Sequence, residues 1–326
     1  MTFEQVQGNE SAKSLLRHAV DSGRIGHAYI LQGKKGVGRM TLARAFASAV
    51  LGTDNPDTHP DFTVVTNQLY DPSKKQETVL VDTIRNMKRD VYIRPYAGDH
   101  KIYVIPKADT MQAPAQNSLL KVFEEPPGYC TILLLAENAN SFLPTILSRA
   151  PVLRLHPLDI KQAADFLEKH HALTPQRAEQ LAILSGGALG KALDMLEDSD
   201  ASALREETFR HLMNLLDGGY RALYDLVRFL KQNKAYADFI LEILLSWSQD
   251  LLYMKIGGTR FQIVNTDKKD QLQTFCGRIT RTAAFRFSEI TVRYQGIIGQ
   301  NANYPVAVLC MVTEYWEEIH GRNHRS

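Results

Sequence analysis

The sequence has few cysteines, and those it has are scattered. Its 326 residues contain three, Cys130, Cys276 and Cys310. Wide spacing excludes a disulfide framework and a cysteine-rich metal module, so we expect three buried free thiols. Cysteine usage of this kind favours a reducing, cytoplasmic compartment.

The sequence also lacks long apolar runs and a large excess of either charge. No segment approaches the roughly 18 consecutive apolar residues of a membrane span, and the first residues do not resemble a secretory signal. Lys and Arg total 38 against 36 Asp and Glu, a net charge of +2. This balance excludes a strongly basic DNA-coating protein and leaves room for a local basic patch.

The first half of the chain alternates short apolar segments with helical patterns. Buried strands are expected at residues 28–31, 62–65, 102–105, 131–135 and 152–155. Apolar residues spaced three and four apart predict the intervening helices, the first of them capped by Asn9 or Ser11. Short buried strands that alternate with helices predict an α/β fold with a parallel five-stranded sheet.

The pattern becomes helical after Pro157. Pro175 suits the start of a helix, and Gly186 and Gly187 suit a break between two helices. Further along, one helical face collects apolar residues, namely Ile240, Ile243, Leu244, Trp247 and Leu251. We therefore predict three domains, which are an α/β domain at 1–157, a small helical domain at 158–200 and a larger helical domain at 201–326.

Residues 33–38, GKKGVG, lie between a predicted strand and a predicted helix. Glycines at Gly33, Gly36 and Gly38 would let backbone N–H groups converge on phosphate oxygens at the start of the helix. A complete phosphate loop continues with Lys and then Ser or Thr, whereas Arg39 and Met40 stand here. A planar guanidinium does not replace the lysine, and methionine has no hydroxyl for Mg²⁺.

A second metal-binding position is missing as well. Active phosphate-loop ATPases place an Asp at the end of a later buried strand. Here the strand at 102–105 is followed by Pro106 and Lys107, and Asp109 comes too late to substitute. Two missing metal contacts predict no autonomous ATP hydrolysis. Nucleotide binding without hydrolysis stays open, as does a chance glycine-rich turn.

Several segments resemble one family, the clamp-loader AAA+ subunits. Residues 116–127, QNSLLKVFEEPP, resemble its N-x-L-L-K-x-L-E-E-P-P signature. Residues 143–149, LPTILSR, resemble its Ser-Arg-Cys region, with Ala150 in place of the cysteine. Residues 26–28 (GHA) and 59–61 (HPD) are similar too. A degenerate phosphate loop with an intact Ser-Arg pair resembles the non-catalytic, delta-prime type of bacterial DNA polymerase III.

The resemblance implies an AAA+ domain of the phosphate-loop type, a helical lid and an all-α collar that mediates oligomerisation. It implies that Arg149 enters the ATP site of a neighbouring subunit as an arginine finger, supported by Ser148. The degenerate loop formed by Gly33, Gly36, Gly38 and Arg39 would be empty or bind ATP or ADP weakly.

The implied partners are those of a hetero-oligomer within the DNA polymerase III holoenzyme. They are the gamma/tau and delta subunits, and, through the complex, the beta sliding clamp and primed DNA. Gly190 occupies the position where active members carry a nucleotide-sensing arginine. Many relatives carry a four-cysteine zinc module, but residues 52–58 are short and lack cysteine, so no zinc is expected. His59 is expected to act as a turn or capping residue rather than as a metal ligand.

Other interpretations stay open for several residues. Arg149 could form an ordinary surface salt bridge, and residues 124–127 could simply stop a helix or could contact a subunit or the clamp. Either DNA or solvent could face a set of basic residues, Lys34, Lys35, Arg85, Lys88, Arg89 and Arg94. An apolar helix face is formed by Leu223, Leu226, Val227 and Leu230. The default interpretation is that it packs inside its own domain, and the additional hypothesis is that part of it contacts another subunit. Rival functions are an unusual AAA+ ATPase and a non-enzymatic AAA+ scaffold of another DNA-processing machine.

Overall fold

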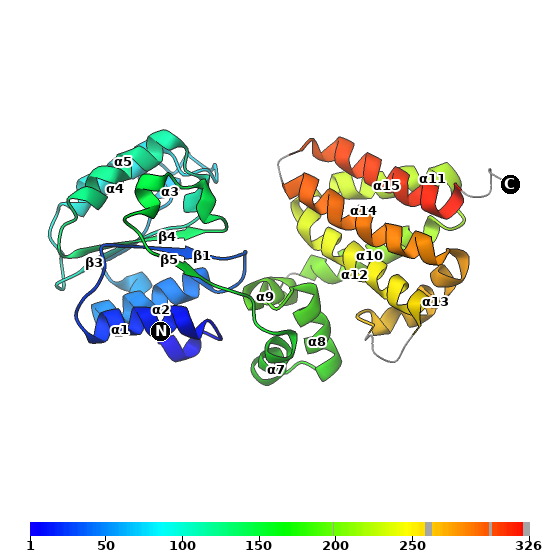
Figure 1. Cartoon of the computed structure of the whole chain (residues 1–326), viewed down its shortest axis with the longest axis horizontal. Helices are drawn as coiled ribbons and strands as arrows, with labels where there is room; N and C mark the ends of the chain where they lie inside the picture. The colour runs from blue at the N-terminus through cyan, green and yellow to red at the C-terminus, as the bar shows by residue number, and fades with distance from the viewer. Residues whose placement is uncertain (198, 258–262, 300–301, 322–326) are drawn as a thin grey trace. The chain divides into compact units, whose positions relative to one another are not determined.

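The computed structural model describes residues 1–197, 199–257, 263–299 and 302–321. The chain divides into two compact units, which are Met1–Ala163 with Gly186–Lys191, and Ala164–Ser185 with Ala192–Ser326 (Figure 1). Residues 158–200, predicted as a separate domain, contribute to both units. The division of the sequence into three domains stays a prediction.

The first unit contains a parallel sheet of five strands, as predicted. In chain order the strands are β1 (Ala28–Gln32), β2 (Phe62–Val64), β3 (Lys101–Ile105), β4 (Cys130–Ala136) and β5 (Val152–Arg154). They lie in the order β2-β3-β4-β1-β5, with β4 paired to β1 and β3 in the middle. Because all strands are parallel, their carboxyl ends share one edge of the sheet and their amino ends share the opposite edge.

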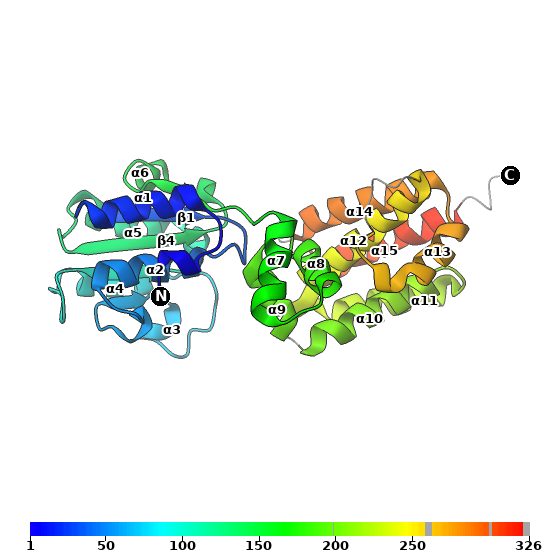
Figure 2. The ribbon, with the colours of Figure 1, turned by 90° about the horizontal axis from the view of Figure 1, so that it is seen from below.

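Helices cover both faces of this sheet. They are α1 (Glu10–Asp21), α2 (Arg39–Leu51), α3 (Asn67–Tyr70), α4 (Val81–Val91), α5 (Ala113–Glu124) and α6 (Pro144–Leu147). Figure 1 shows α1 and α2 on one face and α4 and α5 on the other. In the view from below, α1 and α2 lie in front of the sheet (Figure 2).

Successive strand residues point into two hydrophobic cores, one on each face of the sheet. In β1, Tyr29 and Leu31 pack with α1 and α2, whereas Ala28 and Ile30 point to the face covered by α4 and α5. All seven residues of β4 are buried. Burial on both faces explains why the central strands are continuous apolar runs rather than alternating ones.

After β5 the described residues form helices and no strand, as predicted for the chain beyond Pro157. The helices are α7 (Ile160–His171), α8 (Pro175–Leu184), α9 (Leu189–Glu197), α10 (Ser199–Asn214), α11 (Gly219–Gln232), α12 (Ala237–Ile256), α13 (Lys269–Arg278), α14 (Arg281–Gly299) and α15 (Tyr304–His320). A chain of ring contacts links Phe209, Trp247, Phe275, Phe287 and Tyr315 in the core of the second unit. Among the described helices, none combines the length and the apolar character needed to cross a membrane.

The predicted helix boundaries hold at two places and need a correction at a third. Pro175 begins α8, and Gly186 and Gly187, with φ of 62° and 78°, separate α8 from α9. Asn9 precedes α1, but its side chain does not cap this helix. With φ of 55°, Asn9 instead bonds both main-chain groups of His156, at 2.7 and 3.2 Å.

The cysteines also require a correction. Cys130 in β4 and Cys276 in α13 are buried free thiols, as predicted, whereas Cys310 is exposed. The prediction is wrong for Cys310 because α15 turns one face to the core and this residue lies on another. Burial raises the pKa of Cys130 to about 12, which leaves it an inert thiol.

Candidate functional site

The predicted phosphate loop, residues 33–38, lies between β1 and α2 at the carboxyl edge of the sheet. The N–H of Gly33 donates to the carbonyl of Ala136 at 2.9 Å, which ties the start of the loop to the end of β4. Gly36 and Gly38 have φ of 84° and 93°, a conformation that glycine adopts without strain. The predicted strand–loop–helix arrangement is therefore confirmed.

This loop packs directly against the start of α9. The N–H of Gly190 donates to the carbonyl of Gly36 at 2.8 Å. A Cβ atom on Gly36 would lie 2.5 Å from the main-chain nitrogen of Lys191, and one on Gly190 would lie 3.0 Å from the Cα of Gly36. A Cβ on Gly36 would therefore force a shift of the main chain at Lys191, and a Cβ on Gly190 would be tightly packed against Gly36.

Arg39 stands at the position of the missing loop lysine and is the first residue of α2. Its Nη2 lies 3.3 Å from Oε1 of Glu137, and its side chain is only 14% exposed. Glu137 follows β4, and its N–H donates to the Asp109 carboxylate at 2.8 Å. Asp109 thus supports the chain after β4, and that it does not act as a metal ligand stays a prediction. The positive charge of Arg39 is matched inside its own chain.

The residues at this edge do not fit a magnesium nucleotide. Met40 packs partly buried against the core that contains α1 and α2. Pro106 and Lys107 directly follow β3, and the next carboxylate in the chain, that of Asp109, accepts the N–H of Glu137. Across the described parts of the chain, no three His, Cys, Asp or Glu side chains gather as a metal site would require. That nucleotide and zinc are absent from the working protein stays a prediction.

Arg149 lies between α6 and β5, and its guanidinium is held at the surface. Nη1 donates to the carbonyl of Thr145 at 3.1 Å and to Oγ of Ser148 at 3.2 Å, and Nη2 donates to Oε1 of Glu124 at 3.4 Å. Ser148 in turn donates to the Thr145 carbonyl at 3.1 Å. The Arg149 side chain is 35% exposed, so solvent reaches it, while its hydrogen bonds restrict its orientation.

Arg149 and the phosphate loop lie at opposite edges of the sheet. Arg149 precedes β5, and Ile30 of β1 pairs with Val152 at the start of that strand. The phosphate loop instead follows the carboxyl end of β1. Five residues of strand separate the two edges by about 16 Å. Arg149 therefore cannot act on a phosphate held in the loop of its own chain.

Two further residues support the Arg149 segment, and sequence reasoning assigned neither of them a role. Gln116, which is buried, donates to the carbonyls of Met111 and Ser141 at 2.9 and 3.0 Å and accepts the N–H of Leu143 at 2.8 Å. It thereby joins α5 to the chain that leads to Arg149. Burial lowers the pKa of His27, while a hydrogen bond with the Arg149 main chain acts in the opposite direction.

The residues around Pro126 end a helix, as one of the two open interpretations expected. Helix α5 stops at Glu124, and Glu125, with φ of −127° and ψ of 66°, is no longer helical. The same Glu124 pairs with Arg149, so the helix stop also brings a carboxylate to the guanidinium. His59 is a turn residue, as expected, since its Nδ1 accepts the N–H of Asp61 at 3.2 Å.

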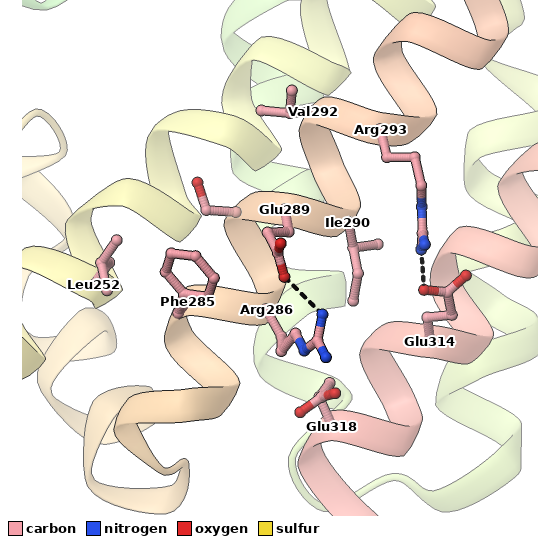
Figure 3. A pocket seen from close by; sticks show the side chains of 10 residues that line it. Leu252, Phe285, Arg286, Glu289, Ile290, Val292, Arg293, Glu314 and Glu318 are labelled. Carbon is pink, nitrogen blue, oxygen red and sulfur yellow. Dashed lines mark hydrogen bonds and ion pairs between the residues drawn. The ribbon is translucent and has the colours of Figure 1, made fainter.

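The second unit carries an open groove of 680 Å³ between α12, α14 and α15 (Figure 3). Phe285 and Val292 of α14 lie exposed along it. Two ion pairs lie along the edge of the groove, one joining Arg286 to Glu289 at 2.8 Å and another joining Arg293 to Glu314.

The predicted apolar face that contains Leu226 is buried in the core of the second unit. This confirms the default interpretation, that the face packs inside its own domain.

Two family models match separate parts of the chain. A model described as DNA polymerase III, delta subunit, matches residues 8–159. A second, described as DNA polymerase III, delta subunit, C terminal, matches residues 199–301.

Similar proteins carry related names. The tau subunit of DNA polymerase III from Escherichia coli is 31% identical over 216 residues, which cover 62% of this chain and 33% of that protein. The delta' subunit from Bacillus subtilis is 26% identical over 262 residues, 74% of this chain and 77% of that one. The delta' subunit from Pseudomonas aeruginosa is 31% identical over 181 residues, 50% of this chain and 53% of that one. The chain therefore matches about a third of the length of the Escherichia coli tau subunit.

Proposed function

The chain belongs to the clamp-loader subunit family of bacterial DNA polymerase III, and we propose that it is a delta-prime-like, non-catalytic member. In this proposal it joins gamma/tau and delta subunits in a hetero-oligomer that places the beta sliding clamp on primed DNA. Its own contribution to ATP hydrolysis is Arg149, supplied in trans to the ATP site of the neighbouring subunit.

The single observation that carries this proposal is the position of Arg149. Its guanidinium is partly exposed and paired with Glu124 at the sheet edge opposite the phosphate loop, so a phosphate that it contacts must belong to another subunit. Thr145, Ser148 and Glu124 hold it in one orientation before that subunit arrives. A guanidinium held in this way would stabilise charge on the transferring phosphoryl group, an effect worth about 10³–10⁵ in rate.

The proposal assigns no hydrolysis to this chain's own loop. Arg39 already pairs with Glu137, and the Gly36 carbonyl already accepts the N–H of Gly190. Arg39 is thus engaged within its own chain, and Met40 offers no hydroxyl to hold Mg²⁺. The loop instead packs against the start of α9 and accepts a hydrogen bond from it.

The groove in the second unit would serve the collar of the oligomer. Phe285 and Val292 are exposed apolar residues of the groove lining, and charged residues lie beside them (Figure 3). A strip of this kind suits a helix of an adjacent subunit, because apolar anchors inside a polar rim are the usual anatomy of a protein interface.

Reconstitution tests the proposal. The chain is mixed with gamma/tau, delta, the sliding clamp and primed DNA, and steady-state ATP hydrolysis is measured. Arg149→Ala should assemble normally and lower the stimulated rate by at least about 10³-fold at the one site it completes. Arg24→Ala removes another exposed arginine near the amino end of β1 and should leave the rate unchanged.

Three results would contradict this proposal. The first is an unchanged rate with Arg149→Ala, and the second is clamp loading that does not require the chain. The third is sustained ATP turnover by the purified chain alone, which would favour the rival AAA+ ATPase.

A further inference from the structure

The segment between α4 and β3, residues 92–99, forms an exposed loop at the amino edge of the sheet, here called the aromatic loop. Tyr92, Ile93 and Tyr96 expose large apolar surfaces on it, and Tyr96 is 68% exposed. The loop precedes β3, whereas Arg149 precedes β5 at the far end of the strand order. It is therefore separate from both the phosphate loop and the proposed finger. Clustered exposed apolar side chains mark a contact surface.

Two buried charged side chains hold the main chain of the aromatic loop in place. The carboxylate of Asp61, which is 1% exposed, accepts two N–H groups of the loop at 2.7 and 2.8 Å. Nζ of Lys101, which is also 1% exposed, donates to the carboxylate of Asp90 at 3.3 Å and to the carbonyl of Ile93 at 3.5 Å. These hydrogen bonds to main-chain groups of residues 93, 96 and 97 hold the loop in the observed conformation.

Tyr96 is supported on one side and open on the other. Nζ of the buried Lys101 lies 5.1 Å from the centre of the Tyr96 ring, a cation–π arrangement. The residue nevertheless stays largely exposed, so ring surface remains open to solvent. A tyrosine supported in this way is a platform on which a nucleobase can stack.

Three cationic side chains flank this platform, and Asp99 is the one acidic residue within the loop. Lys88 and Arg89 lie in the last turn of α4, and Arg94 lies in the loop itself. Neighbouring Arg85 pairs with Asp82 at 3.2 Å. In contrast, Lys88, Arg89 and Arg94 form no ion pair with any residue that the structure describes. Cations next to open aromatic rings match the alternation of phosphates and bases along a single strand.

We propose that the aromatic loop binds single-stranded nucleic acid, with Tyr92 and Tyr96 stacking on bases and Arg89 and Arg94 contacting phosphates. The two tyrosines and the unpaired arginines suit a nucleic acid, which carries both negative charge and flat bases. They suit an apolar surface of another protein less well. This site goes beyond the proposed function and does not depend on Arg149.

Fluorescence anisotropy of the full chain at low salt tests the site. The probe is a labelled oligothymidylate of about 20 nucleotides, longer than usual site sizes of about 4–16. Tyr96→Ala should weaken binding about tenfold, as the loss of one stacked base predicts. Arg94→Ala should lower the slope of log Kd against log salt by about 0.7. The matched control is Tyr224→Ala, because Tyr224 is 65% exposed but lies on α11 in the second unit.

Several results would overturn the proposal. The chain could fail to bind the oligonucleotide at concentrations up to about 100 μM, the weak limit of non-specific nucleic-acid binding. Tyr96→Ala could bind like the control, or a duplex of equal length could bind as tightly as the single strand. Tyr96→Ala could also spare oligonucleotide binding and weaken contact with the sliding clamp, which would make the loop a protein-docking surface. Loss of ATPase stimulation in Arg149→Ala is measured separately, so either idea can fail alone.

Discussion

Replacing Gly36 with alanine tests how closely the start of α9 rests on the phosphate loop, and two costs add in this variant. The φ of 84° is strained for any residue with a Cβ, at about 1–2 kcal/mol. The new Cβ would lie 2.5 Å from the main-chain nitrogen of Lys191. Overpacking of this kind costs about 1–3 kcal/mol. Gly36→Ala should therefore destabilise the first unit by about 2–5 kcal/mol.

Gly38→Ala is the matched control for this variant. Gly38 has a similar φ of 93°, and a Cβ there would meet nothing within 4 Å. Gly38→Ala should lower the free energy of unfolding only by the backbone strain, about 1–2 kcal/mol. The difference between the two variants isolates the clash with Lys191, which should amount to about 1–3 kcal/mol.

Urea unfolding followed by far-UV circular dichroism measures both variants. Tryptophan fluorescence would not serve, because Trp247 and Trp316 both lie in the second unit. Hydrogen exchange adds a local measurement, since the N–H of Gly190 donates to Gly36. If the contact opens to relieve the clash, this amide loses protection in Gly36→Ala and keeps it in Gly38→Ala. Equal destabilisation with equal Gly190 protection would refute the reasoning.

Three other predictions concern the Arg149 segment. Glu124→Gln removes the carboxylate facing Arg149 and should lower the stimulated ATPase rate about two- to fivefold, because an exposed ion pair contributes little free energy. The control is the same change at exposed Glu125, which should leave the rate unchanged. Gln116→Ala leaves buried main-chain groups unpaired, so urea unfolding should show a loss of about 1–3 kcal/mol, and a loss near zero would contradict the assigned hydrogen bonds. The folded-state pKa of His27 is lowered, so below about pH 6.5 the unfolded chain binds more protons than the folded one. The free energy of unfolding therefore carries no penalty from His27 above that pH and decreases as the pH falls below it. His27→Gln should flatten this decline in unfolding experiments from pH 7.5 to 5, and parallel curves would rule out the assignment.

Much of the architecture follows from local sequence. The parallel sheet is visible because each strand is a short apolar run buried on both faces, and helices intervene with apolar residues spaced three and four apart. The degenerate loop could be found because its chemistry depends on adjacent positions, from Gly33 to Met40. Local pattern failed where a side chain had a distant alternative, as when Asn9 bonded His156 instead of capping α1.

The sequence by itself determined which chemical groups this protein has and lacks. It contains a glycine loop without lysine or hydroxyl, a strand end without a carboxylate, and a Ser-Arg pair before the last strand. Only the tertiary structure decided what these groups meet. It placed Gly190 against Gly36, paired Arg39 with Glu137 and set Arg149 at the edge away from its own loop. Such partners lie far apart in the chain, and periodicity over a few residues carries no information about them until strand order and packing bring them together.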